Sequence, residues 1–307
     1  MRSIFIETLV DEAKNNENIF LITPDLGYSV LENFRDLFPN RFMNCGIQEA
    51  NGIGISAGLA LSGKIPYIYS IIPFVTMRPF EQIRVNLAYM NTNVRIVGVG
   101  AGFTYGQAGA THHAIEDIAI IRALPNMTIL SPSCDDEVRE LTKQSINHKG
   151  PIYLRLGRKF NINSNNDIVM GKPNILLRDK CAEIAIFFTG NALDIVLQTQ
   201  DILQTQKINV ELISIHTIKP SSKQDILELI ENKKSIFSIE EHSIIGGLGS
   251  MLAEIIAESG GGKIFKRFGI NDAYSHFVGN QSYIRENFKL NPKDISNDIV
   301  EILRGQK

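Results

Sequence analysis

Short apolar runs alternate with helix-length amphipathic stretches along this chain of 307 residues, and that alternation limits the possible folds more than any other feature. The runs are rich in Ile, Val and Tyr and are bounded by Pro, Gly or Asn, as buried strands are. In the first half, strands are predicted at 18–23, 65–70, 94–100, 127–132 and 151–156, and helices at 3–15, 48–62, 79–90, 114–124 and 135–147. Because predicted strands and helices alternate along the sequence, the pattern predicts a parallel sheet with helices on both faces.

An Asn-rich segment that also carries a Gly and a Pro interrupts this rhythm after residue 160 and is typical of a linker. A second alternating pattern follows it. This pattern predicts strands at 183–188, 209–214, 235–240 and 263–268, and helices at 191–206, 221–232, 248–259 and 292–304. The sequence therefore predicts an α/β chain of two parallel-sheet domains, residues 1–160 and 181–307, joined by a linker at 161–180.

The charge balance and the apolar pattern argue against several classes of function. The chain has 31 basic and 33 acidic residues and a formal net charge of −2, without a basic tail, which argues against nucleic-acid binding. Its apolar runs are shorter than the ~18 residues of a membrane span. Three cysteines without metal-ligand spacing favour a reducing compartment, and the acidic residues near Met1 are atypical of a signal peptide. We therefore expect a cytoplasmic protein that binds neither nucleic acid nor a membrane.

A glutamate opens an unusual predicted helix in the segment EANGIGISAGLALSG. Gly52, Gly54 and Gly58 lie inside this helix, although each glycine costs roughly 1 kcal/mol there relative to alanine. A face with so few side chains allows close approach, either by another part of the same chain or by a second helix or a flat ligand. Glu49 could simply complement the helix dipole from the first turn, or it could supply a carboxyl group to a site.

Four segments, in order, resemble the transketolase family. NCGIQEANGIGISAGLALSG resembles the segment that holds the family's catalytic glutamate. RPFEQIRVNLAYMNTNVRIVGVGAG and GATHHAIEDIAIIRALPNMTILSPSCDDEV resemble further family segments, and EEHSIIGGLGSMLAEII resembles the C-terminal domain, so the resemblance covers essentially the whole chain. It implies thiamine diphosphate chemistry, with Glu49 hydrogen-bonded to a nitrogen of the aminopyrimidine ring. It also implies that the glycine-rich helix lies at a subunit contact.

The resemblance implies the surroundings of that ring as well. Phe74, in SIIPFVTMRPF, matches the family's stacking aromatic, although by itself it could be an ordinary core phenylalanine. Ile71 and Met77 stand where larger or aromatic residues are common, so the expected pocket is apolar but differently shaped. Asp25 matches an aspartate at a strand end, which is where parallel sheets bind ligands.

Two histidines and one alanine bear on the substrate. His112, in GATHHAIED, matches a histidine that contacts the substrate near the reacting carbonyl, where it could donate to a developing oxyanion or shuttle a proton. His113 follows it, at a position where the family often has glutamine. By themselves the two histidines could equally be surface residues of a loop. Ala108 stands where the family has an aspartate that hydrogen-bonds a sugar hydroxyl. An alanine cannot make this bond, which argues against ordinary pentose-phosphate specificity.

Arg2, Ser29 and Arg155 fall where the family binds the sugar phosphate, and arginines and a hydroxyl suit that task. Arg155 could alternatively be a surface arginine at a strand end. Gly100 stands where the family has a further phosphate ligand, a histidine. The expected phosphate-binding site therefore lacks one of its usual ligands. The substrate is therefore expected to be a small sugar, with or without a phosphate.

The chain contains no G-D-G sequence, with which the family holds the diphosphate and its metal. The resemblance therefore implies a separate N-terminal subunit that carries this motif and the Mg²⁺ or Ca²⁺ ion, in an α2β2 assembly, and no metal site in this chain. The predicted function is the C-terminal, pyrimidine-binding subunit of a split transketolase, which transfers a two-carbon ketol unit from a ketose to an aldehyde. Two alternatives stay open: a decarboxylating enzyme resembling deoxyxylulose-phosphate synthase or the beta chain of a 2-oxo-acid dehydrogenase, and a catalytically silent partner subunit.

Overall fold

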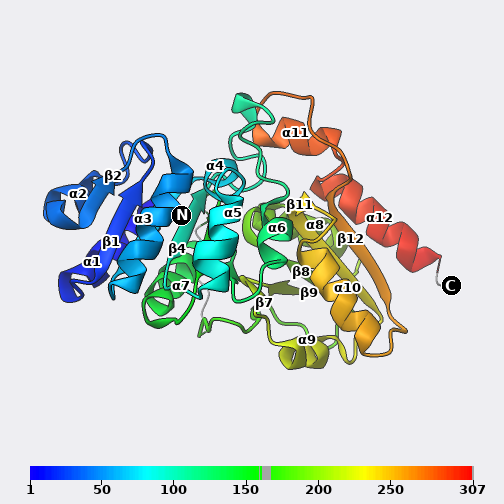
Figure 1. The fold of residues 1–307 in the computed structure, drawn as a ribbon. Helices are drawn as coiled ribbons and strands as arrows, with labels where there is room; N and C mark the ends of the chain where they lie inside the picture. The colour runs from blue at the N-terminus through cyan, green and yellow to red at the C-terminus, as the bar shows by residue number, and fades with distance from the viewer. Residues whose placement is uncertain (159, 161–166, 306–307) are drawn as a thin grey trace.

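The computed structural model describes residues 1–158, 160 and 167–305. They form two α/β units side by side, each a sheet with helices packed on both faces (Figure 1). The fold class predicted from the sequence is confirmed. Within the described residues, no helix combines the length and the apolar character that a bilayer span requires.

The first sheet has the strand order β10–β5–β6–β4–β3–β1–β2. Its strands are β1 (Ile19–Thr23), β2 (Phe42–Asn44), β3 (Ile65–Ile71), β4 (Arg95–Val99), β5 (Thr128–Leu130), β6 (Ile152–Leu156) and β10 (Thr217–Lys219). Neighbouring strands run parallel except at one edge, where β10 pairs antiparallel with β5. The carboxyl ends of the parallel strands meet at one edge, so the segments that follow β1, β3, β4 and β6 come together there.

The second sheet has the strand order β12–β11–β8–β9–β7. Its strands are β7 (Asn174–Leu177), β8 (Ile184–Phe188), β9 (Glu211–Ser214), β11 (Ser235–Ser243) and β12 (Ile264–Ile270). These strands also run parallel except at an edge, where β7 pairs antiparallel with β9. Each sheet is therefore parallel in its interior, as predicted, with one antiparallel edge strand that was not predicted.

Helices cover both faces of each sheet. Apolar side chains of α1 and α7 pack on one face of the first sheet, and those of α3, α4 and α6 pack on the other. In the second unit, α8 and α12 pack on one face and α9 and α10 on the other. The helices are α1 (Arg2–Asn15), α2 (Glu32–Leu37), α3 (Glu49–Leu61), α4 (Ile72–Thr76), α5 (Phe80–Gln82), α6 (Asp117–Arg122), α7 (Asp135–Asn147), α8 (Leu193–Thr205), α9 (Lys223–Ile230), α10 (Leu248–Glu258), α11 (Gln281–Asn287) and α12 (Pro292–Arg304). One apolar cluster contains residues of both α6 and α10, so the two units share part of their core.

Every predicted strand and helix is present, and the structure adds short elements that the pattern missed. The additions include β2, β7, β10, α2, α4 and α11. β7 falls inside the segment predicted as a linker, and β10 joins the first sheet although it follows β9 of the second in sequence. The helix predicted at 79–90 begins as α5 and continues as a π-helix, η2 (Ile83–Tyr89), a geometry that side-chain periodicity does not reveal.

The glycines of α3 differ in their surroundings. A Cβ added to Gly52 would lie 2.8 Å from Ile68 Cδ1 and 3.2 Å from Cys45 Sγ, so this glycine permits tight packing within the chain. A Cβ added to Gly54 or Gly58 would meet nothing within 4 Å. These two glycines are four residues apart and share one helix face. They form a strip of the helix surface without side chains, and contacts within this chain do not explain why both residues are glycine.

Replacing Gly54 or Gly58 with alanine is expected to stabilise the isolated chain by about 0.5–1 kcal/mol, because alanine favours the helix and its methyl group meets no neighbour. Urea unfolding followed by far-ultraviolet circular dichroism measures the change. Gly52→Ala serves as the control, because its methyl group must displace Ile68 or Cys45 and should gain less stability or lose it. Equal gains at all three positions would contradict the packing of α3.

Candidate active site

Glu49 is the first residue of α3 and is almost completely buried, with 4% of its surface exposed. The helix begins here because the residue before it, Gln48, has a non-helical backbone and follows a turn in which Gly46 has a φ of +73°. The Glu49 oxygen Oε1 accepts a hydrogen bond from Arg78 Nη1 at 3.0 Å. The structure thus places one carboxyl group at the positive end of a helix, shielded from bulk water.

Phe74, in α4, belongs to the same cluster as Glu49. The Arg78 guanidinium group, which donates to Glu49, also lies over Phe74: its central carbon is 3.9 Å from the centre of the Phe74 ring. The His112 ring meets Phe74 edge-on, with ring centroids 5.0 Å apart and planes inclined by 70°. Three residues that the sequence assigned to one site therefore lie together. Arg78 is a fourth member of this cluster that the sequence analysis missed, although it stands in the quoted segment RPFEQIR.

The residues of this cluster fit an aminopyrimidine ring. Glu49 offers a buried carboxyl group for a ring nitrogen, and Phe74 offers an aromatic face for stacking. Ile71, which precedes α4, and Met77, which follows it, are half-buried apolar neighbours of Phe74 in sequence. Among the residues that the structure describes, no group of three or more His, Cys, Asp or Glu side chains is arranged to hold a metal ion.

Asp25 lies just after β1 and is tied to the loop that leads to α3. Its Oδ1 accepts hydrogen bonds from Asn44 Nδ2 at 2.9 Å and from the Tyr28 hydroxyl at 3.2 Å. Asn44 Oδ1 in turn accepts from the backbone N–H groups of Asp25 and Gly46. Asp25 therefore lies at the carboxyl edge of the sheet, as expected, and its backbone has a φ of +55°.

His113 is placed differently from His112. It is 4% exposed, its ring lies edge-on to Phe103 with centroids 5.1 Å apart, and its Nε2 lies 3.4 Å from the Gly106 carbonyl oxygen. Burial, with the neighbouring His112, lowers the pKa of His113, so the ring is neutral near pH 7. His113 thus braces the loop that carries His112, and its geometry offers no support for the predicted substrate contact.

Arg155 lies inside β6 and is 1% exposed, which corrects the expectation that it reaches a sugar phosphate. Its Nε donates to Asp117 Oδ2 at 2.8 Å, and its Nη2 donates to the Ala114 carbonyl oxygen at 2.9 Å. It also donates to the Glu241 carbonyl oxygen of β11 at 3.3 Å. A guanidinium buried among these partners joins the two units and is not available to an anion from solvent.

Arg158 lies beyond the end of β6 and is exposed. It lines a pocket of about 360 Å³ with Ala108 and with residues 279–281 of the second unit. Within the described part of the chain, its guanidinium makes no hydrogen bond or ion pair. Tyr105, which lines the same pocket, packs its ring directly over Gly100 and occupies the space that a larger residue there would need.

Arg2 and Ser29, the other predicted phosphate ligands, are exposed. Burial raises the pKa of Tyr69, while the positive charge of Arg2 opposes this rise and Tyr105 adds to it. Arg2 does not line the Arg158 pocket. Ser29, at a φ of +60°, donates its backbone N–H to Glu32 Oε1 at 2.7 Å.

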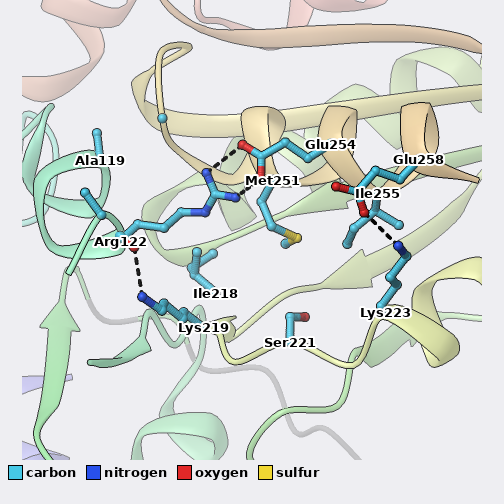
Figure 2. Close-up of a pocket in the computed structure, with 12 residues that line it drawn as sticks. Ala119, Arg122, Ile218, Lys219, Ser221, Lys223, Met251, Glu254, Ile255 and Glu258 are labelled. Atoms are coloured by element: carbon cyan, nitrogen blue, oxygen red, sulfur yellow. Dashed lines mark hydrogen bonds and ion pairs between the residues drawn. The ribbon is translucent and has the colours of Figure 1, made fainter. Parts of the chain in front are cut away.

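A second cavity, of about 480 Å³, lies between α6 and α10 at the junction of the two units (Figure 2). The charged side chains that line it are already paired, Arg122 with Glu254 and Lys223 with Glu258. Lys219 Nζ donates to backbone carbonyl oxygens of the segment that follows α6. The cluster of Glu49, Phe74, Arg78 and His112 contributes no residue to the lining of this cavity. The cavity therefore belongs to the junction between the two units.

Two family models match this chain. One, described as transketolase, pyrimidine binding domain, matches residues 1–161. The other, described as transketolase, C-terminal domain, matches residues 174–295. The first range contains Glu49, Phe74 and His112, and the second begins at β7, inside the segment that the sequence predicted as a linker.

Two relatives match this chain over more than nine-tenths of their own length. One of the subunits of the apulose-4-phosphate transketolase of Actinobacillus succinogenes is 32% identical over 299 residues, which cover 96% of each chain. The 6-deoxy-6-sulfo-D-fructose transketolase subunit SqwH of Clostridium sp. (strain MSTE9) is 33% identical over 299 residues, 96% of this chain and 92% of that one. A solved structure described as a split gene transketolase, inactive beta4 tetramer, has a TM-score of 0.88 at 30% identity and covers 98% of this chain and 97% of its own. The chain therefore belongs to the transketolase family.

Proposed function

We propose that this chain is the pyrimidine-binding subunit of a two-chain, thiamine diphosphate-dependent transketolase that moves a two-carbon ketol unit from a ketose to an aldehyde. The observation that carries the proposal is the buried carboxyl group of Glu49 in one cluster with Phe74 and His112. The relatives matched over more than nine-tenths of their own length are named transketolase subunits, which favours transfer over decarboxylation. The free cysteines suit a reducing compartment, and we place the enzyme in the cytoplasm.

Thiamine diphosphate, when bound, supplies an electron sink that allows a carbon–carbon bond beside a carbonyl group to break. Glu49 would share a proton with a nitrogen of the aminopyrimidine ring, and its burial keeps water from competing for that hydrogen bond. Phe74 would hold the ring by stacking, between the apolar residues that flank α4. His112 would donate a hydrogen bond to the substrate oxygen that gains negative charge. Thr111 Oγ1 lies 2.9 Å from His112 Nδ1 and can orient the ring.

A separate N-terminal subunit is proposed to hold the diphosphate and its Mg²⁺ or Ca²⁺ ion. The sequence lacks the G-D-G motif, and the structurally similar split-gene chain is described as inactive when it forms a beta4 tetramer, which supports the need for a partner. We expect an α2β2 assembly in which another chain covers the strip formed by Gly54 and Gly58. Asp25, at the end of β1, would border the bound cofactor.

The proposed substrate is a sugar with an anionic end group. The names of the two relatives include a phosphate in one case and a sulfonate in the other. Arg158, assisted by Arg2, offers the forked donors that suit either anion. Ser29 stays a predicted ligand of the same group. Ala108 lines the Arg158 pocket without a side chain that could read a hydroxyl, so specificity should differ from that of enzymes with an aspartate there.

Replacing Arg158 with methionine is expected to raise KM for an anionic sugar by about 10- to 100-fold with little change in kcat, because a charge-assisted contact made equally in the ground and transition states is lost. Steady-state kinetics of the assembled enzyme measures both constants. The uncharged form of the same sugar is the control and should keep its KM. Equal losses for the charged and uncharged sugars would contradict the assignment.

The proposed function is tested by combining the chain with its partner subunit, thiamine diphosphate and Mg²⁺. A phosphorylated or sulfonated ketose and an aldehyde acceptor should yield an aldehyde two carbons shorter than the donor and a ketose two carbons longer than the acceptor, both detected by mass spectrometry. Release of carbon dioxide from pyruvate, without ketol exchange, would overturn the proposal in favour of a decarboxylating enzyme. Cofactor binding without turnover of any donor would identify a silent subunit.

A further inference from the structure

We propose that the Arg78 side chain occupies the cofactor-ring site in the free subunit and must leave it for the ring to bind. The inference rests on the proposed function, which assigns Glu49 and Phe74 to the aminopyrimidine ring. That ring needs a hydrogen-bond partner at Glu49 and a stacking surface at Phe74. In the structure, one planar group, the Arg78 guanidinium, already takes both contacts.

The two contacts of Arg78 are made by the same flat head group. Its Nη1 donates to Glu49 Oε1 at 3.0 Å, and its central carbon lies 3.9 Å from the centre of the Phe74 ring. A guanidinium is planar and delocalised, so it can stack on an aromatic ring and donate in its own plane at the same time. An aminopyrimidine combines the same two abilities, which makes the two groups competitors for one place.

The burial of the two partners indicates which group moves. The Glu49 side chain is 5% exposed, whereas the Arg78 side chain is 50% exposed. Arg78 lies in the turn of residues 77–79 between α4 and α5, so its side chain is held by a loop and not by a helix. Arg78 can therefore move into solvent at low cost, while Glu49 stays fixed at the start of α3. Until then, the arginine compensates the buried negative charge, which would be costly without a partner.

When Arg78 occupies the site, only the fraction of molecules with an open site can bind the ring. The apparent association constant then equals the intrinsic constant multiplied by that fraction. Removing the guanidinium should therefore strengthen binding of the ring. If Arg78 instead held Glu49 in place alongside the bound ring, its removal should weaken binding. The direction of the change separates these two roles.

The test uses the isolated full chain and the free pyrimidine half of the cofactor, 4-amino-5-hydroxymethyl-2-methylpyrimidine, in a ligand-observed NMR titration. Arg78→Met is expected to bind this probe about three- to tenfold more tightly than the wild type, which is about 0.7–1.4 kcal/mol. Arg78→Lys keeps the charge but not the flat head group, and should gain less. Arg139→Met is the matched control, because Arg139 also donates to a carboxylate, Asp136 at 3.1 Å, from a partly exposed position in α7.

A second measurement needs no ligand. Carbodiimide labelling followed by mass spectrometry should modify Glu49 faster in Arg78→Met than in the wild type, with no change in Arg139→Met. Unchanged or weaker probe binding in Arg78→Met overturns the inference and leaves the proposed function intact. Equal probe binding by Arg78→Met and by the double variant Glu49→Gln/Arg78→Met would instead show that the ring does not use Glu49, which overturns the proposed function.

Discussion

Glu49→Gln is expected to lower kcat of the assembled enzyme by about 10²- to 10⁴-fold, the range for loss of a group that moves a proton. Glutamine has nearly the same shape, so it preserves the packing around a side chain that is 5% exposed. It cannot exchange a proton with a ring nitrogen. In the cofactor-free chain the Arg78 side chain loses its ion pair, but it is half-exposed and can be hydrated, so no buried cation is left without a partner. Steady-state kinetics with saturating thiamine diphosphate and Mg²⁺ measures the loss.

The control for this substitution is Glu140→Gln in α7, an exposed glutamate paired with Lys143, which should leave kcat unchanged. Thermal unfolding of both variants should match that of the wild type within about 2 °C, because neither change alters the core. A Glu49→Gln enzyme that retains kcat within a factor of three would remove the proposed mechanism. A low kcat together with a much lower melting temperature would show that Glu49 is needed for the stability of the fold.

Periodicity alone predicted the long elements of the fold, because each buries an apolar face of several residues. It missed β10, whose three residues carry no strand pattern of their own and pair with β5 far away in the sequence. For the linker it predicted at most a short hairpin, and not β7 (Asn174–Leu177), which lies at the edge of the second sheet next to Asn-rich sequence. The assignment of β10 to the first sheet is a long-range pairing, which no local window of sequence contains.

The candidate site was predictable only in part, for a related reason. The resemblance led to Glu49, Phe74 and His112, and the structure places these three together. It led to Arg155 for the anion, although the predicted strand 151–156 already placed that residue inside a buried strand. The rule that ligands lie beyond the carboxyl ends of strands, had it been applied to β6, would have indicated Arg158, two residues after that strand. Arg78 carried no separate signal, because its two contacts arise from different segments, α3 and α4.

Arg155→Met is expected to cost about 3–5 kcal/mol of the free energy of unfolding, because it leaves the Asp117 carboxylate buried without its counter-ion. The two side chains are 1% and 0% exposed and are paired at 2.8 Å. Asp117 would keep the hydrogen bond from the Tyr153 hydroxyl at 2.6 Å. Burial and then the charge of Asp117 raise the pKa of Tyr153, so that hydroxyl remains a donor. One neutral donor does not replace a bidentate cation in a dry site.

Urea unfolding of the isolated chain measures this loss. The double variant Asp117→Asn/Arg155→Met should recover part of the stability, because neither of these two positions then buries a charge and asparagine still accepts from Tyr153. Arg122→Met is the control: its partner Glu254 is largely exposed, so the change should cost less than about 1 kcal/mol. If Arg155→Met left stability unchanged but raised KM for an anionic sugar, Arg155 would be a substrate ligand after all. A cost that the second substitution relieves would show that Arg155 pairs with Asp117 and that this ion pair holds β6 against α6.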